Sequence, residues 1–127
     1  MNFVVFRFLR MMVRDYGFDF TITENNRYKT ECIIAKIPPK LLNILKDLHY
    51  EVPSRRIMHD SGGNLIKDFY EDDKIPVCQI VKLPDGTPGI SVVFDDDSAA
   101  KKMNKLAIAI REYFCSNSMI KSIKYAN

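Results

Sequence analysis

The side chains of this chain that could do chemistry are few and widely spaced. The two histidines are His49 and His59, and the three cysteines, Cys32, Cys78 and Cys115, form no Cys-x-x-Cys pair. Metal sites usually draw three or four such ligands from short spacings, and this sequence has no such cluster. We therefore predict no metal, no cofactor and no catalytic residue, and we interpret the cysteines as reduced core residues.

Two acidic runs, at 71–73 and 95–97, have the oxygen ligands that a hard cation prefers. Calcium loops interleave their ligands with a glycine that turns the chain, and neither run does so. The second run leads directly into Ser98, and short acceptors in this position are typical of a helix start. We interpret that run as a helix cap and the first run as part of a charged loop over 71–76.

The sequence Asp-Ser-Gly-Gly at 60–63 resembles the motif around the nucleophile of chymotrypsin-like serine proteases. That family has Gly before the Asp and Pro after the second Gly, where this chain has His59 and Asn64. The family also needs two β-barrels, which 127 residues do not supply. A catalytic triad is brought together by the fold, and sequence neighbours rarely point at one another. We therefore interpret the motif as a hairpin turn.

The remaining candidates for a binding site are basic side chains in two parts of the chain. One part is the N-terminal segment and the other is the middle of the chain. Stacking and charge could be added to the middle part by Tyr70 and by the C-terminal residues Lys121, Lys124 and Tyr125. No glycine-rich phosphate loop accompanies either part. The candidate binding residues are Arg7, Arg10 and Arg14 in the N-terminal segment and Arg55, Arg56, His59 and Lys67 in the middle of the chain.

Length and composition are those of one ordinary globular domain. The chain has 127 residues, 46% of them hydrophobic and 28% charged, and its net charge of +3 is a weak basic bias. Dedicated nucleic-acid binders usually show a denser basic stripe. The odd cysteine count favours a reducing compartment, and arginines interrupt the apolar start long before the ~20 residues of a membrane span. We predict a cytoplasmic domain over 1–127 without a membrane span.

The first half of the chain shows helix and hairpin patterns. Residues 3–14 predict a helix that ends at Gly17, with a buried strand over 2–9 as the alternative. Alternating apolar residues predict a hairpin over 18–37. Pro38-Pro39 can then open a short apolar helix that reaches Val52-Pro53.

The second half contains the clearest pattern in the sequence. A weak hairpin is expected from strands at 55–60 and 65–70, and a stronger one over 77–94 around the turn Pro-Asp-Gly-Thr-Pro-Gly. Apolar residues at steps of three and four then predict a helix from Ser98 to Cys115. Residues 116–127 are expected to be a last short element or a frayed, flexible tail.

This element order predicts an α+β fold, an antiparallel meander of five or six strands flanked by N-terminal, middle and C-terminal helices. The order is similar to profilin-like, longin and roadblock arrangements, and the resemblance extends to element order only. By elimination we predict a non-catalytic interaction module or regulator that binds a protein partner, with homodimerisation through residues 1–14 as one form. The alternatives are a nucleic-acid or nucleotide-binding regulator with a basic patch, and a small enzyme with no recognisable motif.

Overall fold

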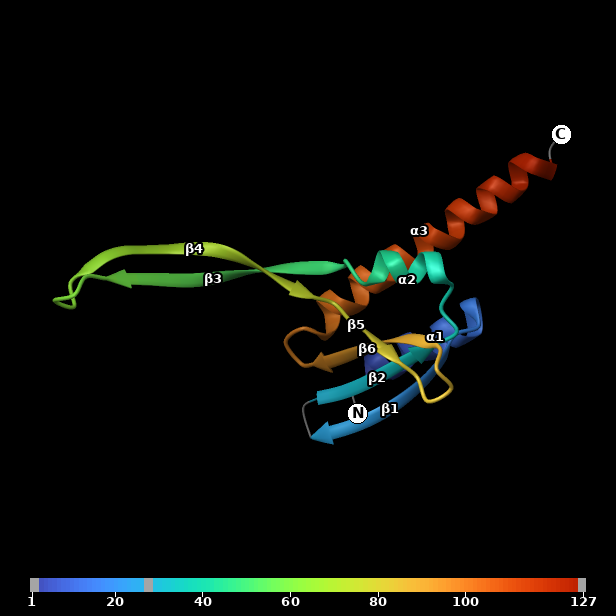
Figure 1. Ribbon diagram of the computed structural model, residues 1–127, viewed down its shortest axis with the longest axis horizontal. Coiled ribbons are helices and arrows are strands. Elements are labelled where there is room, and N and C mark those ends of the chain that lie inside the picture. Colours follow the sequence, from blue (N-terminus) through green and yellow to red (C-terminus); the bar gives the residue numbers. More distant parts are fainter. Residues whose placement is uncertain (1–2, 27–28, 126–127) are drawn as a thin grey trace.

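The structure is a computed structural model that describes residues 3–26 and 29–125, without the side chains of 24–26 and 117–125. This part of the chain contains three helices and six antiparallel strands (Figure 1). In order they are α1 (Phe3–Tyr16), β1 (Asp19–Asn26), β2 (Lys29–Ala35), α2 (Pro39–Leu45), β3 (His49–His59), β4 (Leu65–Pro76), β5 (Gln79–Lys82), β6 (Pro88–Asp95) and α3 (Ala99–Tyr125). The α+β class predicted from the sequence is confirmed.

The strands form two separate sheets rather than the single meander expected from the sequence. Four of them pair in the order β1-β2-β6-β5, whereas β3 and β4 pair with each other as a two-stranded ribbon. The profilin-like order is not confirmed, because β2 pairs with the last strand instead of with the next one along the chain. Arg55 and Arg56 are neighbours in β3, so their side chains point to opposite faces of the ribbon. Packing either face of the ribbon against the core would therefore bury a charged side chain, and this favours a ribbon that stays separate from the four-stranded sheet.

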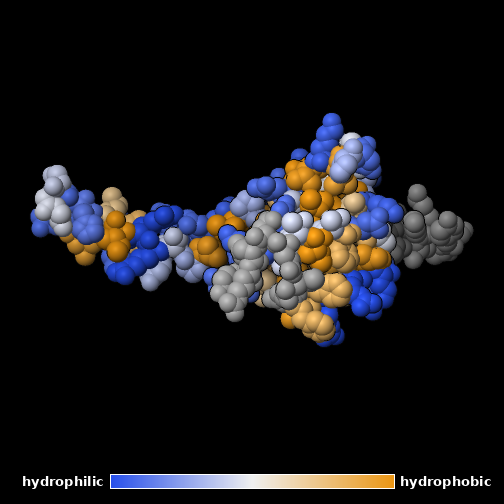
Figure 2. Space-filling model, turned by 90° about the horizontal axis from the view of Figure 1, so that it is seen from below, coloured by the Kyte–Doolittle hydropathy of each residue, from blue (hydrophilic) through white to orange (hydrophobic). Residues whose placement is uncertain are grey.

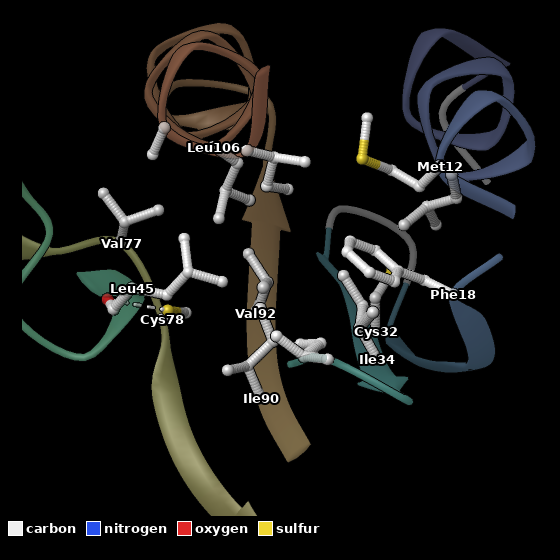
Figure 3. Packing of buried hydrophobic residues seen from close by; sticks show 14 of the residues in the cluster. Met12, Phe18, Cys32, Ile34, Leu45, Val77, Cys78, Ile90, Val92 and Leu106 are labelled. Atoms are coloured by element: carbon white, nitrogen blue, oxygen red, sulfur yellow. Dashed lines mark hydrogen bonds between the residues drawn. The ribbon is translucent and has the colours of Figure 1, made fainter. Parts of the chain in front are cut away.

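The hydrophobic core lies between the four-stranded sheet and the two helices α1 and α3, which cover the same face of that sheet (Figure 3). Met12 of α1 and Leu106 of α3 point into the space between the two helices, above Val92 of the central strand β6. The opposite face of the sheet is more polar, and one row across it from β1 to β5 consists of Thr21, Ile33, Ser91 and Gln79.

The N-terminal segment forms the predicted helix, and the strand alternative is wrong. Val5, Leu9 and Met12 recur at steps of four and three, so they share the face of α1 that packs into the core, and each is almost fully buried. The helix ends at Gly17, whose φ of 73° lies in the left-handed region that favours glycine.

In the middle of the chain the strands are longer than predicted and the helix is shorter. The helix α2 ends at Leu45, so residues 49–53 belong to β3, and the expected loop over 71–76 is the end of β4. Pro53 is tolerated because a two-stranded ribbon leaves one edge of β3 without a partner strand. The acidic run is tolerated because Arg56 forms ion pairs with both Glu71 and Asp73.

The C-terminal hairpin and helix form as predicted, with two differences. Asp95, rather than Asp96 or Asp97, caps α3: its Oδ1 atom accepts hydrogen bonds from the backbone N–H and the hydroxyl of Ser98, both at 2.7 Å. The helix also continues past Cys115 to Tyr125. Cys115 is exposed, contrary to the expectation of a core thiol, because it lies on the side of α3 opposite Leu106.

We expect Asp95→Ala to lower the free energy of unfolding by about 0.5–2 kcal/mol, since it removes the acceptor that ties Ser98 to the helix start. Asp96→Ala is the matched control, because Asp96 is exposed and its removal leaves the cap intact. Urea denaturation of both variants measures the difference. Equal destabilisation by the two variants would contradict the assignment of the cap to Asp95.

The same cap predicts a dependence of stability on pH. The pKa of the Asp95 carboxyl is lowered mainly by the hydrogen bond from the Ser98 hydroxyl, and also by the hydrogen bond from the Ser98 backbone N–H. Because the pKa of Asp95 is lowered in the folded state, the ionised carboxylate stabilises the fold at pH values above its ordinary pKa of about 3.9. This contribution to the free energy of unfolding is lost as the pH falls through the folded pKa. Between pH 5 and about pH 3, wild type should therefore lose stability more steeply than Asp95→Ala.

Candidate functional site

The most distinctive surface of the molecule is the ribbon of β3 and β4 (Figure 1). It projects from the four-stranded sheet and its helices, which we call the body. We call its outer part, residues 54–72, the arm. The 11 residues of β3 correspond to roughly 37 Å at ~3.4 Å per residue. Every residue from Arg55 to Asp68 is exposed. The arm is therefore held by pairing between its own two strands, with little packing against the body.

The tip of the arm is the hairpin turn predicted for the Asp-Ser-Gly-Gly motif. The Asp60 carboxylate accepts hydrogen bonds from the backbone N–H groups of Gly62 and Asn64, both at 2.9 Å, and Gly63 takes a φ of 81°. These hydrogen bonds lower the pKa of Asp60, and those from Asn64 have the largest effect. Asp60 thus closes the turn, and its neighbour His59 is exposed at the same tip.

One face of the arm carries a stripe of exposed apolar side chains. Arg55 pairs with Tyr70 and Ile57 pairs with Asp68, so these four residues share a face, and Ile66 joins them by strand alternation. We call Ile57, Ile66 and Tyr70, which are 48%, 61% and 71% exposed, the apolar stripe. Hydrophobic side chains are visible among the charged ones on the arm in Figure 2. A stripe of this kind is typical of an interaction surface.

The basic residues of the arm do not form a common patch. Arg55 forms a bidentate ion pair with Asp68, with Nε–Oδ1 and Nη2–Oδ2 distances of 2.9 and 2.6 Å. On the other face, Arg56 contacts Asp73 at 2.6 Å and Glu71 at 3.5 Å. The hydrogen bond from Arg55 lowers the pKa of Asp68. Each guanidinium is therefore neutralised within the ribbon.

Lys67, a further basic candidate of this region, lies on the same face of the ribbon as Arg56. The Nζ atom of Lys67 lies 4.2 Å from the centroid of the Phe69 ring, in a cation–π contact on the arm. The side chains of Lys121, Lys124 and Tyr125 lie outside the described residues. Because Arg56 is paired with Glu71 and Asp73 on that same face, the described part of the arm mixes acidic and basic groups there and gives the nucleic-acid hypothesis little support.

The N-terminal arginines do lie together, along the exposed side of α1. The guanidinium of Arg7 lies 5.9 Å from the Phe3 ring centroid and that of Arg10 lies 5.8 Å from the Phe6 ring centroid. Arg14 forms an exposed ion pair with its neighbour Asp15, at 2.9 Å. All three arginines border a groove of about 860 Å³ between α1 and α3.

Sequence reasoning missed the apolar stripe and the groove. A signal for the stripe was present, since Ile57-Met58 and Leu65-Ile66 place apolar residues on both faces of strands that also carry charges on both faces. Such a ribbon has no face that can be buried in the chain's own core. The groove had no such signal, because its two walls are distant in the sequence.

Other classes of site find no support in the described residues. Within residues 3–26 and 29–125, no group of three or more His, Cys, Asp or Glu side chains could hold a metal ion. No helix in that part of the chain is long and apolar enough to cross a membrane. Comparisons with protein-family models, with curated proteins and with solved structures found no match. The functional interpretation therefore depends on the geometry of the arm and the groove.

Proposed function

We propose that this chain is a small non-catalytic protein-interaction module whose arm binds a second copy of the chain. The observation that carries the proposal is the apolar stripe, three large side chains about half exposed or more on a projecting ribbon. Exposed apolar residues that lie side by side cost free energy in water, and burial against a partner recovers about 25 cal/mol per Å².

The charges beside the apolar stripe favour a second copy as the occupant. Arg55 and Asp68 flank Ile57 on the same face, one cation and one anion. Arg55 and Asp68 form an ion pair within each copy, so a two-fold symmetric contact can bring these faces together without placing like charges against one another. A face with charges of one sign would repel the same face of a second copy. The cation and the anion beside the apolar stripe balance each other, so two copies of this face do not repel.

The size of the surface sets the expected strength of the dimer. Six partly exposed side chains, three from each copy, contribute on the order of 1 kcal/mol each when buried. The loss of translational and rotational freedom opposes this gain. We therefore expect a weak dimer with a dissociation constant of about micromolar or higher, in which exchange between monomer and dimer is fast.

The paired substitution Ile57→Asp with Ile66→Asp should abolish the dimer, because it places two carboxylates in the centre of the contact. Sedimentation equilibrium of the full chain over about 1–200 µM measures association. Ile80→Asp is the matched control, since Ile80 is 43% exposed but lies on β5, away from the arm. A wild-type chain that stays monomeric at the highest concentration, or a control variant that dissociates equally, would overturn the proposal.

A cytoplasmic location is part of the same proposal. It is supported by the free thiols of Cys32, Cys78 and Cys115, which fit a reducing compartment. Fractionation of the native host, with the chain detected by antibody, tests this part separately from the dimer.

A further inference from the structure

The groove between α1 and α3 combines an apolar floor with a basic rim, and it lies on the body rather than on the arm. Phe8 and Met11 of α1 and Met103 and Ala107 of α3 line it, together with the three arginines of α1. Its volume is about 860 Å³. Its apolar lining residues Phe8, Met11, Met103 and Ala107 are each partly exposed, so a ligand can reach the floor from solvent.

The charge of the rim is free to meet a ligand. Arg7 and Arg10 have no carboxylate within ion-pair distance among the described residues, and their contacts are with the rings of Phe3 and Phe6. Within the part of the chain that the structure describes, Arg14 pairs with its own neighbour Asp15, in an exposed position where such a pair contributes little. Steps of three and four residues place the arginines along about 10 Å of the helix.

We propose that this groove binds an acidic amphipathic helix of a protein partner. The floor accepts the apolar side of such a helix, and the arginines face carboxylates that recur at its i, i+3 or i+4, and i+7 positions. The apolar floor lies between two helices, which is the setting of helix-in-groove recognition. Because no residue of the arm borders the groove, the two surfaces can be occupied independently.

The probe for the test is a synthetic helical peptide of about 18 residues. It carries leucines at helical spacing on one side and glutamates beside them. Fluorescence anisotropy with the full chain should show saturable binding that weakens as salt rises, because the rim contributes through charge. The same peptide with lysine in place of glutamate should bind at least about tenfold more weakly.

Variants of the chain locate the binding surface. Arg7→Glu combined with Arg10→Glu should weaken binding of the acidic peptide at least about tenfold and strengthen binding of the lysine peptide. Arg111→Glu is the matched control, since Arg111 is an exposed arginine of α3 that does not border the groove. A thermal melt by circular dichroism confirms that each variant is folded.

Three results would overturn the inference. They are no peptide binding at low salt, equal loss of peptide binding in the Arg111→Glu control, and binding of anionic vesicles or palmitate that Arg7→Glu combined with Arg10→Glu abolishes while the peptide does not bind. The last result would assign the groove to a lipid. The Ile57→Asp, Ile66→Asp variant should bind the peptide like wild type, so failure here and failure of the arm dimer are read separately.

Discussion

Replacing Leu106 with alanine is expected to lower the free energy of unfolding by about 2–5 kcal/mol. Leu106 of α3 has no exposed surface, and it points from the helix into the core above Val92 (Figure 3). Removing its three outer carbon atoms loses their transfer free energy and leaves a cavity that α1, α3 and the sheet can close only in part. A loss of this size is a large fraction of the stability of a small domain.

Ile108→Ala is the matched control for this experiment. Ile108 lies two residues further along the same helix and is 45% exposed, so its truncation should cost about 0.5 kcal/mol or less. Equilibrium denaturation of both variants in urea gives the two values. If they were equal, the packing of α3 on the sheet through Leu106 would be contradicted. An intermediate value for Leu106→Ala would indicate that the neighbouring side chains close the cavity.

The second large effect concerns the reactivity of the cysteines. Burial raises the pKa of Cys32 to about 12 and that of Cys78 to about 11. At pH 8 their thiolate fractions are then about 10⁻⁴ and 10⁻³, against roughly a quarter for an ordinary thiol in water. Cys115 is exposed on α3. We therefore expect one thiol to react rapidly in the folded protein and the other two to react orders of magnitude more slowly.

Titration with Ellman's reagent under non-denaturing conditions measures this difference. The native chain should release one equivalent quickly, and the chain in denaturant should release three. The variant Cys115→Ser should lose the fast equivalent and keep the other two. Rapid reaction of Cys32 or Cys78 in that variant, without denaturant, would show that the core opens far more readily than its packing indicates.

The raised pKa values also predict the behaviour of the protein in alkali. In the unfolded chain both thiols lose their protons near the ordinary pKa of about 8.5, while in the folded chain they stay protonated until about pH 11 and about pH 12. The unfolded state therefore binds fewer protons in this window, so stability falls as the pH rises through it. Denaturation midpoints at pH 8 and pH 10 should show the decline.

The arm and the body differ in what substitutions should do to them. Side chains of the arm are exposed and interact within the ribbon, so changes there should alter association more than stability. Side chains such as Leu106 lie in the shared core, where the reverse is expected. This separation is what allows the arm dimer and the α1–α3 groove to be tested by different variants of one chain.

Local chemistry was enough to predict several elements of the protein, namely α1, the last hairpin and the start of α3. The step of three and four between Val5, Leu9 and Met12 determines which face of α1 is buried. The turn residues between β5 and β6 and the short acceptors before α3 determine where the last hairpin closes and where the last helix begins. Each of these features depends on residues that are close in the sequence, so the pattern can be read without knowing the rest of the fold.

Only the tertiary structure decided which strands pair and which surfaces are left open. The pairing of β2 with β6 joins segments about sixty residues apart, and no local pattern carries that information. The same holds for Arg55 and Arg56, which read as a basic patch in the sequence. Strand alternation sends them to opposite faces, and carboxylates from β4 neutralise both. Sequence alone thus predicted most of the elements and the buried face of α1, whereas contacts between distant segments decided the pairing of β2 with β6, the groove between α1 and α3, and the separation of the arm from the four-stranded sheet.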